Sequence, residues 1–390
     1  MAGYVIAATS SQSKPASPRP RKIAVIWAKF GAYHIARTNA LAQLADVVPI
    51  QFSRYQDYYG WPAEHSAGGA EIVTLSESDL GQIQWPSACR AVWKTLSRGQ
   101  PDVVLVPGYS DPISLTAATW ARVHRRISVL MSESKRDDYS RSFCREWMKR
   151  IVVRVFYTRA LVGGKAAREY VRELGVPDHR IGVGYDVVDN RFFREAAQRI
   201  RKTESHALYG FPPDYFLYVG RLAPEKNLQT LISAYAEYRN EGGQWSLMLV
   251  GSGAEEPTLR SQVAELGIAA HVQFEGFKTT WQLPPYYAFA SCFVLPSRKE
   301  PWGLVVNEAM ASGVPVIVSS RCGSAHDLVI DGANGFTFDP QNPGELKNRM
   351  VQLGGLSQDQ LLEMRRQSQR IINAFSPATF ATEVMRVSRV

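Results

Sequence analysis

The chain has 390 residues, of which 45% are hydrophobic, enough for two domains of ordinary size with full cores. It contains no run of 18 or more apolar residues, so no transmembrane helix is expected, and its four cysteines form no Cys-x-x-Cys pair, so neither a disulfide framework nor a zinc site is expected. The net charge of +9 falls on the first half, because residues 1–200 hold 28 Lys and Arg against 18 Asp and Glu. This asymmetry predicts an anionic partner for that half.

The first half alternates strand-like and helix-like segments after a polar, Pro- and Ser-rich stretch at 1–20, which is expected to be a disordered tail. Strands are expected at residues 23–27, 47–51, 103–106, 127–131 and 160–162. Helices are expected at residues 36–44, 113–123 and 141–156. Such alternation predicts a parallel sheet covered by helices on both faces.

The second half starts the same pattern again. Strands are expected at residues 215–219, 246–250, 271–274, 292–296 and 314–318. Helices are expected at residues 227–239, 257–266 and 283–290, with a last helix at about 377–390. The pattern predicts two Rossmann-like domains, at 21–195 and 196–375, with ligand sites where strands end.

Two glutamates eight residues apart, Glu300 and Glu308, follow the strand expected at 292–296. Glu300 is expected in the turn before a short helix and Glu308 about one turn inside it. The first turn of that helix leaves backbone N–H groups free to hold a phosphate; they belong to Gly303, Leu304 and Val305. An acid on either side of an anion site suits a sugar nucleotide, which has hydroxyls at both ends and a diphosphate between.

Three further strand ends carry residues suited to a nucleotide. Arg221 and Lys226 place two cations after the strand 215–219, where Gly220 lets the backbone approach a ligand closely. The strand 246–250 ends in a small-residue turn made of Gly251, Ser252 and Gly253. Phe277 follows the next strand. An ordinary strand-to-helix loop remains the alternative for the small-residue turn, and simple packing for Phe277.

Residues 297–319, which read SRKEPWGLVVNEAMASGVPVIVS, closely resemble the signature of retaining GT-B glycosyltransferases of family 4, the glycosyl transferases group 1. Residues 220–227, GRLAPEKN, resemble the phosphate clamp of that family. The resemblance implies that Arg221 and Lys226 neutralise a leaving diphosphate, that Glu300 binds a donor-sugar hydroxyl and that Glu308 binds ribose hydroxyls. It also implies that residues 251–253 and Phe277 line the nucleotide, and that the last helix, at 376–390, crosses back to the first domain. No metal or other cofactor is expected, since two cations and a helix dipole supply the positive charge.

In the first half the resemblance is weaker. Gly31, after the first strand, resembles the glycine loop of the family, and His34 beside it is either an acceptor-side residue or a helix-surface histidine. Many members carry a histidine after a later strand of this domain, but here that slot falls on Ser132 or Glu133. Glu133 is either an acceptor-hydroxyl ligand or part of a solvated loop. The family's NGVD turn has a counterpart at 184–189, in which Tyr185 is expected to face the cleft.

The helix expected at 141–156 carries a basic stripe, Arg141, Arg145 and Lys149, with apolar residues elsewhere on the helix. The helix either docks on an anionic membrane through this stripe or packs against the sheet and leaves the stripe as a solvated face. No helix-turn-helix, zinc-finger or RNP-like pattern occurs, so nucleic acid is not an expected partner. An anionic membrane surface or a phosphate-bearing lipid acceptor fits the basic half better.

These residues predict a GT-B fold and a retaining glycosyltransferase that moves a sugar from a nucleotide-diphospho-sugar, with UDP favoured by the resemblance. The acceptor is expected to be a saccharide or a lipid-linked saccharide in polysaccharide or glycoconjugate biosynthesis. The expected location is the cytoplasm, with peripheral contact to the inner face of the membrane. Two alternatives stay open: another GT-B enzyme, such as a sugar-nucleotide epimerase, and a non-catalytic protein that binds nucleotide sugars.

Overall fold

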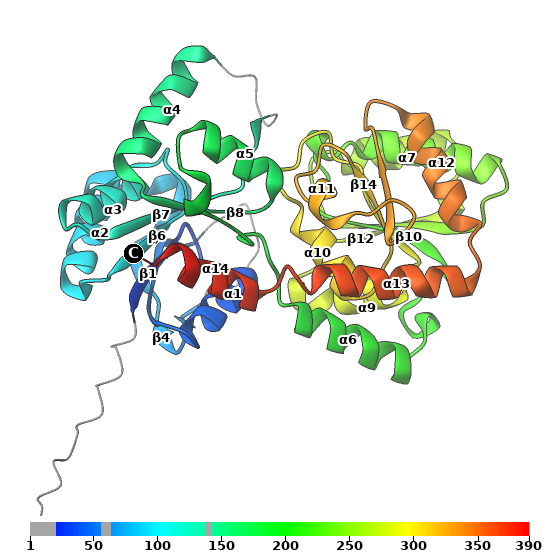
Figure 1. Ribbon diagram of the computed structural model, residues 1–390. Coiled ribbons are helices and arrows are strands. Elements are labelled where there is room, and N and C mark those ends of the chain that lie inside the picture. Colours follow the sequence, from blue (N-terminus) through cyan, green and yellow to red (C-terminus); the bar gives the residue numbers. More distant parts are fainter. Residues whose placement is uncertain (1–20, 56–63, 137–141, 390) are drawn as a thin grey trace, which may run out of the picture.

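The computed structural model describes residues 21–55, 64–136 and 142–389, and the predicted tail at 1–20 lies outside them. Within this part of the chain there are two α/β domains side by side, one around a seven-stranded sheet and one around a six-stranded sheet (Figure 1). Both sheets are parallel throughout, as the alternation of strands and helices predicts. No helix in the described ranges is both long and apolar enough to cross a bilayer.

The first sheet has the strand order β5-β2-β1-β6-β7-β8-β9. Its strands are β1 (Lys22–Trp27), β2 (Asp46–Tyr55), β5 (Val73–Asp79), β6 (Val103–Val106), β7 (Ile127–Ser132), β8 (Arg159–Val162) and β9 (Ile181–Val183). A small hairpin, β3 (Ser66–Ala67) and β4 (Ala70–Glu71), lies beside it. The helices of this domain are α1 (Ala32–Ala42), α2 (Trp85–Gly99), α3 (Pro112–Val123), α4 (Phe143–Phe156) and α5 (Lys165–Glu173).

Strand β1 shows why this sheet is buried on both faces. Ile23 and Val25 lie on one face and pack in one core cluster with Phe380 of the last helix, α14 (Pro377–Val387). Ala24 and Ile26 lie on the other face and join the cluster that α2 and α3 cover. Because successive side chains of a strand alternate between faces, an unbroken apolar run such as this one requires helices on both sides.

The second sheet has the strand order β12-β11-β10-β13-β14-β15. Its strands are β10 (Tyr215–Val219), β11 (Ser246–Val250), β12 (Val272–Gly276), β13 (Cys292–Leu295), β14 (Val316–Ser319) and β15 (Gly335–Phe338). Its longer helices are α6 (Asn190–Thr203), α7 (Leu228–Asn240), α8 (Glu256–Glu265), α9 (Pro284–Phe289), α10 (Leu304–Ala311), α12 (Pro343–Gly354) and α13 (Gln358–Ile372). The predicted limit between residues 195 and 196 falls inside α6, which packs against α9 and α10.

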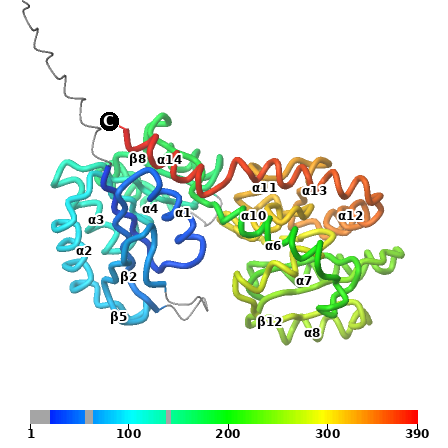
Figure 2. The backbone as a smooth tube through the Cα atoms, turned by 90° about the horizontal axis from the view of Figure 1, so that it is seen from below, coloured from blue at the N-terminus to red at the C-terminus, as the bar shows by residue number. Residues whose placement is uncertain are grey.

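The end of the chain returns to the first domain. Both views show α13 running along the second domain and continuing into α14, which lies on the first (Figures 1 and 2). There α14 packs against α1, β8 and β9. The two domains are therefore connected twice, once through the segment before α6 and once through the segment between α13 and α14.

Several elements differ from the sequence-based expectation. The first helix begins at Ala32 rather than at 36, because Gly31 adopts the extended backbone of an N-cap there. The helix expected at 141–156 begins at Phe143, where the Ser142 side chain accepts a hydrogen bond from Arg145 N–H. Strands β5, β9 and β15 and helices α2, α5, α6, α12 and α13 were not predicted, and most of the helices among them carry many charged residues.

Candidate active site

Loops at the carboxyl ends of the two sheets meet across the seam between the domains. Lys135, just after β7, donates from its ammonium group to the backbone carbonyl of Arg321, just after β14. The backbone N–H of Lys165 donates to the Asp327 carboxylate of α11 (Ala325–Leu328) at 3.1 Å. The carboxyl ends of the strands, where the sequence motifs lie, therefore face one another across the seam. Parallel α/β sheets bind their ligands at these strand ends.

Glu300 and Lys226, predicted to act on the donor, form an ion pair in the second domain. Their side chains are only 12% and 13% exposed, and Ser297 Oγ also donates to Glu300 at 3.2 Å. The side-chain amide of Asn227 ties the two loops together by donating to the Pro296 carbonyl at 3.2 Å. A cation and a carboxylate are thus held side by side, one able to meet a phosphate and the other a hydroxyl.

Arg221 lies on the same loop and pairs with Glu225 at 2.8 Å. Both side chains are about one-third exposed, so the pair is open to solvent on one side. Burial acts to raise the pKa of Glu225, but a backbone hydrogen bond and the adjacent Arg221 guanidinium outweigh it and hold that pKa below its usual value. Each of the two predicted clamp cations therefore faces a carboxylate partner.

The glycines after β10 and β11 serve a close contact between two loops. A Cβ on Gly251 would lie 1.8 Å from the Gly220 carbonyl oxygen, and one on Gly253 would lie 2.3 Å from the Leu222 carbonyl oxygen. Leu222 N–H in turn donates to the Ser252 carbonyl at 2.9 Å. The predicted nucleotide-side loops are thus stacked backbone to backbone, and their missing side chains are explained by that packing.

Helix α10 begins at Leu304, after Gly303 in a left-handed conformation with φ of 93°. A Cβ on Gly303 would approach Leu295 to 2.8 Å and Glu300 to 3.3 Å, so glycine also lets the turn lie close to the Glu300 loop. The N–H groups of Leu304 and Val305 are in the first turn, where helix geometry provides no intrahelical acceptor. The positive end of the helix therefore lies in the same loop that carries Glu300.

Glu308 lies one turn inside α10 and has no exposed surface. One carboxylate oxygen accepts a hydrogen bond from the Tyr33 hydroxyl of α1, and the other accepts from the Tyr287 hydroxyl of α9 at 2.7 Å. Burial raises the pKa of Glu308 to about 7, against the lowering effect of the two tyrosine hydrogen bonds. The carboxyl predicted to bind ribose hydroxyls thus binds two phenolic hydroxyls, one of them from the other domain.

His34 belongs to the same turn as Tyr33 but points inward. Its Nδ1 accepts the Gly31 N–H at 3.1 Å, and its ring lies 4.3 Å from the ring of Trp27. Loss of hydration, and then the nearby charge of Arg37, lower the pKa of His34 to about 3, so the ring is neutral at physiological pH. His34 lies in α1 and is partly exposed, and its ring helps to hold the Gly31 turn in place, while an acceptor-side role for it stays a prediction.

Tyr185 is buried, and its ring lies 5.7 Å from that of Trp27, with the Arg37 guanidinium 5.1 Å from its centre. Asp186, next in the chain, is 1% exposed and 3.8 Å from Arg37, and neither carboxylate oxygen has a hydrogen-bond partner. Burial, and then the charge of Glu133, raise the pKa of Asp186. Glu133 itself is exposed. These first-domain residues therefore form one cluster near the seam.

The Asp186 cluster is linked to the α10 helix. The Asn307 side-chain amide donates to the Asp186 carbonyl at 3.1 Å and accepts from the Trp302 indole N–H at 2.9 Å. Phe277, which was expected to line the nucleotide, follows β12 at the edge of the second sheet, and its side chain is 51% exposed. Asn307, Trp302 and the two tyrosines on Glu308 were not predicted as site residues, although Asn307 and Trp302 lie in the string 297–319 and Tyr33 follows Gly31.

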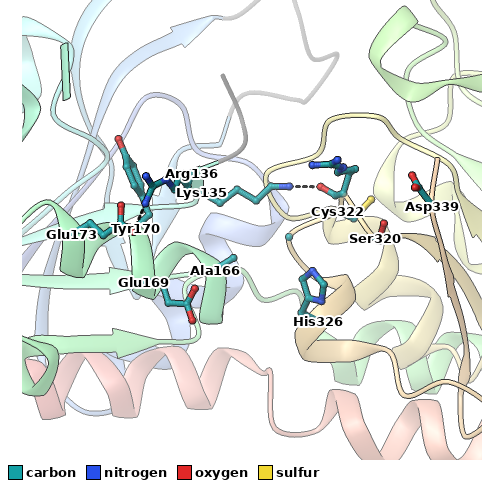
Figure 3. A pocket seen from close by; sticks show the side chains of 12 residues that line it. Lys135, Arg136, Ala166, Glu169, Tyr170, Glu173, Ser320, Cys322, His326 and Asp339 are labelled. Atoms are coloured by element: carbon teal, nitrogen blue, oxygen red, sulfur yellow. Dashed lines mark hydrogen bonds and ion pairs between the residues drawn. The ribbon is translucent and has the colours of Figure 1, made fainter. Parts of the chain in front are cut away.

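A pocket of about 450 Å³ opens between the domains beside the Glu300 loop (Figure 3). Lys135, Arg136 and Glu173 line it from the first domain, while Ser320 and Asp339 line it from the second. Its wall joins the donor-side loop, since Cys322 also lines it and forms a β-bridge with Glu300. Cations, carboxylates and hydroxyls in one concave surface suit a polar molecule with many hydroxyl groups.

Part of this chain is similar in sequence to known glycosyltransferases. Residues 202–370 match the family described as glycosyl transferases group 1. The chain is 28% identical over 210 residues to an alpha-D-kanosaminyltransferase of Streptomyces kanamyceticus, covering 53% of this chain and 54% of that protein. It is 34% identical over 157 residues to a GDP-mannose-dependent alpha-(1-6)-phosphatidylinositol monomannoside mannosyltransferase of Mycolicibacterium smegmatis, covering 38% and 40%. The chain thus spans about half the length of these relatives or less.

Solved structures resemble nearly the whole chain. Anabaena HepE, in complex with UDP and glucose, superposes with a TM-score of 0.69 at 19% identity, covering 94% of this chain and 98% of that one. Sucrose-phosphate synthase of Thermosynechococcus elongatus gives 0.70 at 21% identity, covering 94% and 97%. Identities this low show the fold alone, and that fold is GT-B, as the sequence predicts.

Proposed function

Because residues 202–370 match the family model of the glycosyl transferases group 1, we propose that the whole protein is a retaining glycosyltransferase that uses a nucleotide-diphospho-sugar. The observation that carries the proposal is the Lys226–Glu300 pair, held beside the N-terminus of α10 in a seam between two domains. It places a cation that can bind phosphate, a carboxylate that can bind a hydroxyl and the positive end of a helix close together, and a sugar diphosphate can use all three.

In this proposal the chain acts mainly on the departing diphosphate. Lys226, Arg221 and the N–H groups of the first turn of α10 stabilise its developing charge, and such electrostatic stabilisation usually contributes most to the rate acceleration. Glu300 accepts hydrogen bonds from the donor sugar and so fixes its orientation. Glu308 binds the ribose hydroxyls once Tyr33 has moved away. No metal is needed in this scheme, since two cations and the helix terminus supply the positive charge.

We further propose UDP as the nucleotide and a saccharide or lipid-linked saccharide as the acceptor. HepE was solved with UDP, whereas the mannosyltransferase relative is named for GDP-mannose, so the base needs a direct test. The polar pocket between the domains, with Lys135 and Asp339 on opposite walls, is where we place the acceptor. Polysaccharide or glycoconjugate biosynthesis on the cytoplasmic side of a membrane is the setting that fits the basic first half.

The first test is thermal unfolding with UDP, GDP, ADP and CMP, followed by the matching sugar nucleotides. A ligand of the native state at roughly 100 times its Kd adds about 2.7 kcal/mol to the free energy of unfolding, which shifts the midpoint by several degrees. Lys226→Ala is expected to remove most of the shift. The matched control is Lys347→Ala, which removes a lysine paired with Glu241 away from the seam.

Turnover separates the enzyme from the alternatives. Release of nucleoside diphosphate from the sugar nucleotide, with the product anomer identified by NMR, tests sugar transfer and retention together. Glu300→Gln is expected to lower turnover by at least about tenfold, because one strong hydrogen bond to a charged group is worth more than about 1.4 kcal/mol. Binding without turnover in the wild type would favour the non-catalytic alternative, and no shift with any nucleotide would contradict the proposal.

A further inference from the structure

Helix α4 of the first domain turns its apolar side chains toward solvent. Phe143, Trp147, Ile151 and Val155 recur every four residues, which places them on one face, and they are 86%, 57%, 42% and 45% exposed. Met148 beside them is 55% exposed. We call these five residues the α4 face. In Figure 1 the helix rises from the first domain beyond its other helices.

The orientation of α4 is the reverse of that of an ordinary surface helix, which buries its apolar stripe and exposes its charges. Only Val153 of this helix is buried, and the inner side also carries Lys149, paired with Glu146 at 2.9 Å. Glu146 in turn accepts from the Tyr170 hydroxyl of α5 at 2.9 Å. Arg145 is exposed, and Val153 and Phe156 pack against the first-domain core, as the sequence-based alternative of a solvated face on a packed helix expects, but the five residues of the α4 face also lie toward solvent. Arg141 lies outside the described residues.

Basic residues border the α4 face. With 3.6 residues per turn, Arg145 lies beyond one edge of the face and Arg150 just beyond the other, whereas Arg154 lies within the face at its C-terminal end, and all three are exposed. The helix has four basic residues against one acid, and that acid, Glu146, is already paired. Long basic side chains can keep their charge in water while the stem follows an apolar surface.

We propose that α4 docks in the plane of an anionic phospholipid surface, with the α4 face inserted among the acyl chains and Arg145 and Arg150 on the headgroup phosphates. An exposed apolar stripe with an aromatic residue and flanking arginines is the pattern of an interfacial helix. A second copy of this chain fits less well, because a symmetric contact would bring like-charged arginines together. The proposal goes beyond sugar transfer and does not depend on it.

The position of α4 gives such docking a consequence. The helix follows the loop after β7 along the chain, and that loop carries Lys135, which lines the pocket between the domains. A first domain anchored by α4 would therefore hold that pocket near the lipid surface. A lipid-linked molecule could then reach the seam without leaving the bilayer.

Vesicle flotation of the full chain tests the proposal, with phosphatidylcholine alone and with phosphatidylcholine plus phosphatidylglycerol. The wild type is expected to float with the anionic vesicles only, and less at high salt. Phe143→Ser combined with Trp147→Ser should lower the bound fraction by at least about tenfold, because two large apolar side chains lose their burial. Arg145→Glu combined with Arg150→Glu should abolish the preference for anionic lipid.

Leu208→Ser is the matched control, since Leu208 is an apolar residue 74% exposed on the second domain. It is expected to leave flotation unchanged. All variants should unfold at the wild-type temperature. Such a result would show that the substitutions at exposed positions leave the fold intact. The proposal is overturned if the serine variant floats like the wild type, if neutral vesicles bind as well as anionic ones, or if the serine changes convert a dimer into a monomer instead.

Discussion

At the scale of single residues, the contact between Glu308 and Tyr33 connects the two domains through the proposed ribose site. The two residues are 275 positions apart in the chain, and their side chains meet at a carboxyl group with no exposed surface. Any ligand that hydrogen-bonds to this oxygen of Glu308 must displace the Tyr33 hydroxyl. Donor binding and the contact between the domains are therefore competing interactions for the same acceptor.

Tyr33→Phe is expected to tighten binding of the nucleoside diphosphate by up to about tenfold. The free protein loses one hydrogen bond to a carboxyl group, which is worth about 1–2 kcal/mol, whereas the bound form loses nothing. Isothermal titration of both proteins measures the change. Tyr287→Phe is the comparison, since that hydroxyl lies beside the carboxyl on the second domain in either state, and it should not raise affinity. Unchanged or weaker binding by Tyr33→Phe would show that the two do not compete.

Sequence reasoning identified the polar residues of the candidate site better than their partners. Glu300, Glu308 and Lys226 lie in short strings of characteristic order, so their neighbourhood could be predicted locally. The hydrogen bonds to Glu308 could not, because Tyr33 and Tyr287 come from helices that only the folded chain brings to α10. Spacing along a sequence reports on one element at a time, and contacts between domains lie beyond it.

At the scale of elements, the apolar strands were predicted well and the charged helices poorly. Strands such as β6 and β11 are short apolar runs next to turn residues, which is a strong local signal. Helix α2 buries Ala88, Val92 and Leu96, one residue per turn, and this regular apolar stripe was overlooked among its charged and small residues. The direction in which α4 faces depends on what lies beneath it, which no periodicity reports.

The stacked loops after β10 and β11 give a prediction at this scale. Gly251→Ala should lower the free energy of unfolding by more than about 3 kcal/mol, because its Cβ would lie 1.8 Å from a backbone oxygen that cannot move without the strand. Urea unfolding measures the loss. Gly267→Ala is the matched control, with φ of 69° and nothing within 4 Å of the added Cβ, so it should cost only about 1–2 kcal/mol for the left-handed backbone. Equal losses would mean that the loops do not pack as described.

At the scale of the whole molecule, the last helix belongs to the core of the first domain. Phe380, Val384 and Val387 of α14 share one apolar cluster with Ile23 and Val25 of β1, from the opposite end of the sequence. Helix α13, immediately before, packs instead against α10 of the second domain. The chain therefore closes each domain with residues that come late in the sequence, and the core of the first domain is incomplete until its last helix is in place.

Phe380→Ala should destabilise the first domain by about 3–5 kcal/mol, the usual cost of removing a fully buried aromatic ring. Relative motion is the ordinary behaviour of two domains of one chain, so the loss should stay local. Hydrogen exchange can show this: peptides covering β1, β8 and β9 should lose protection, while those covering β10 and β11 keep it. Leu362→Ala, 46% exposed on α13, should change neither set. Equal loss in both sheets would instead mean that the contacts across the seam, which include those of Lys135, Asp186, Glu308 and Asp327, bind the domains into one cooperative unit.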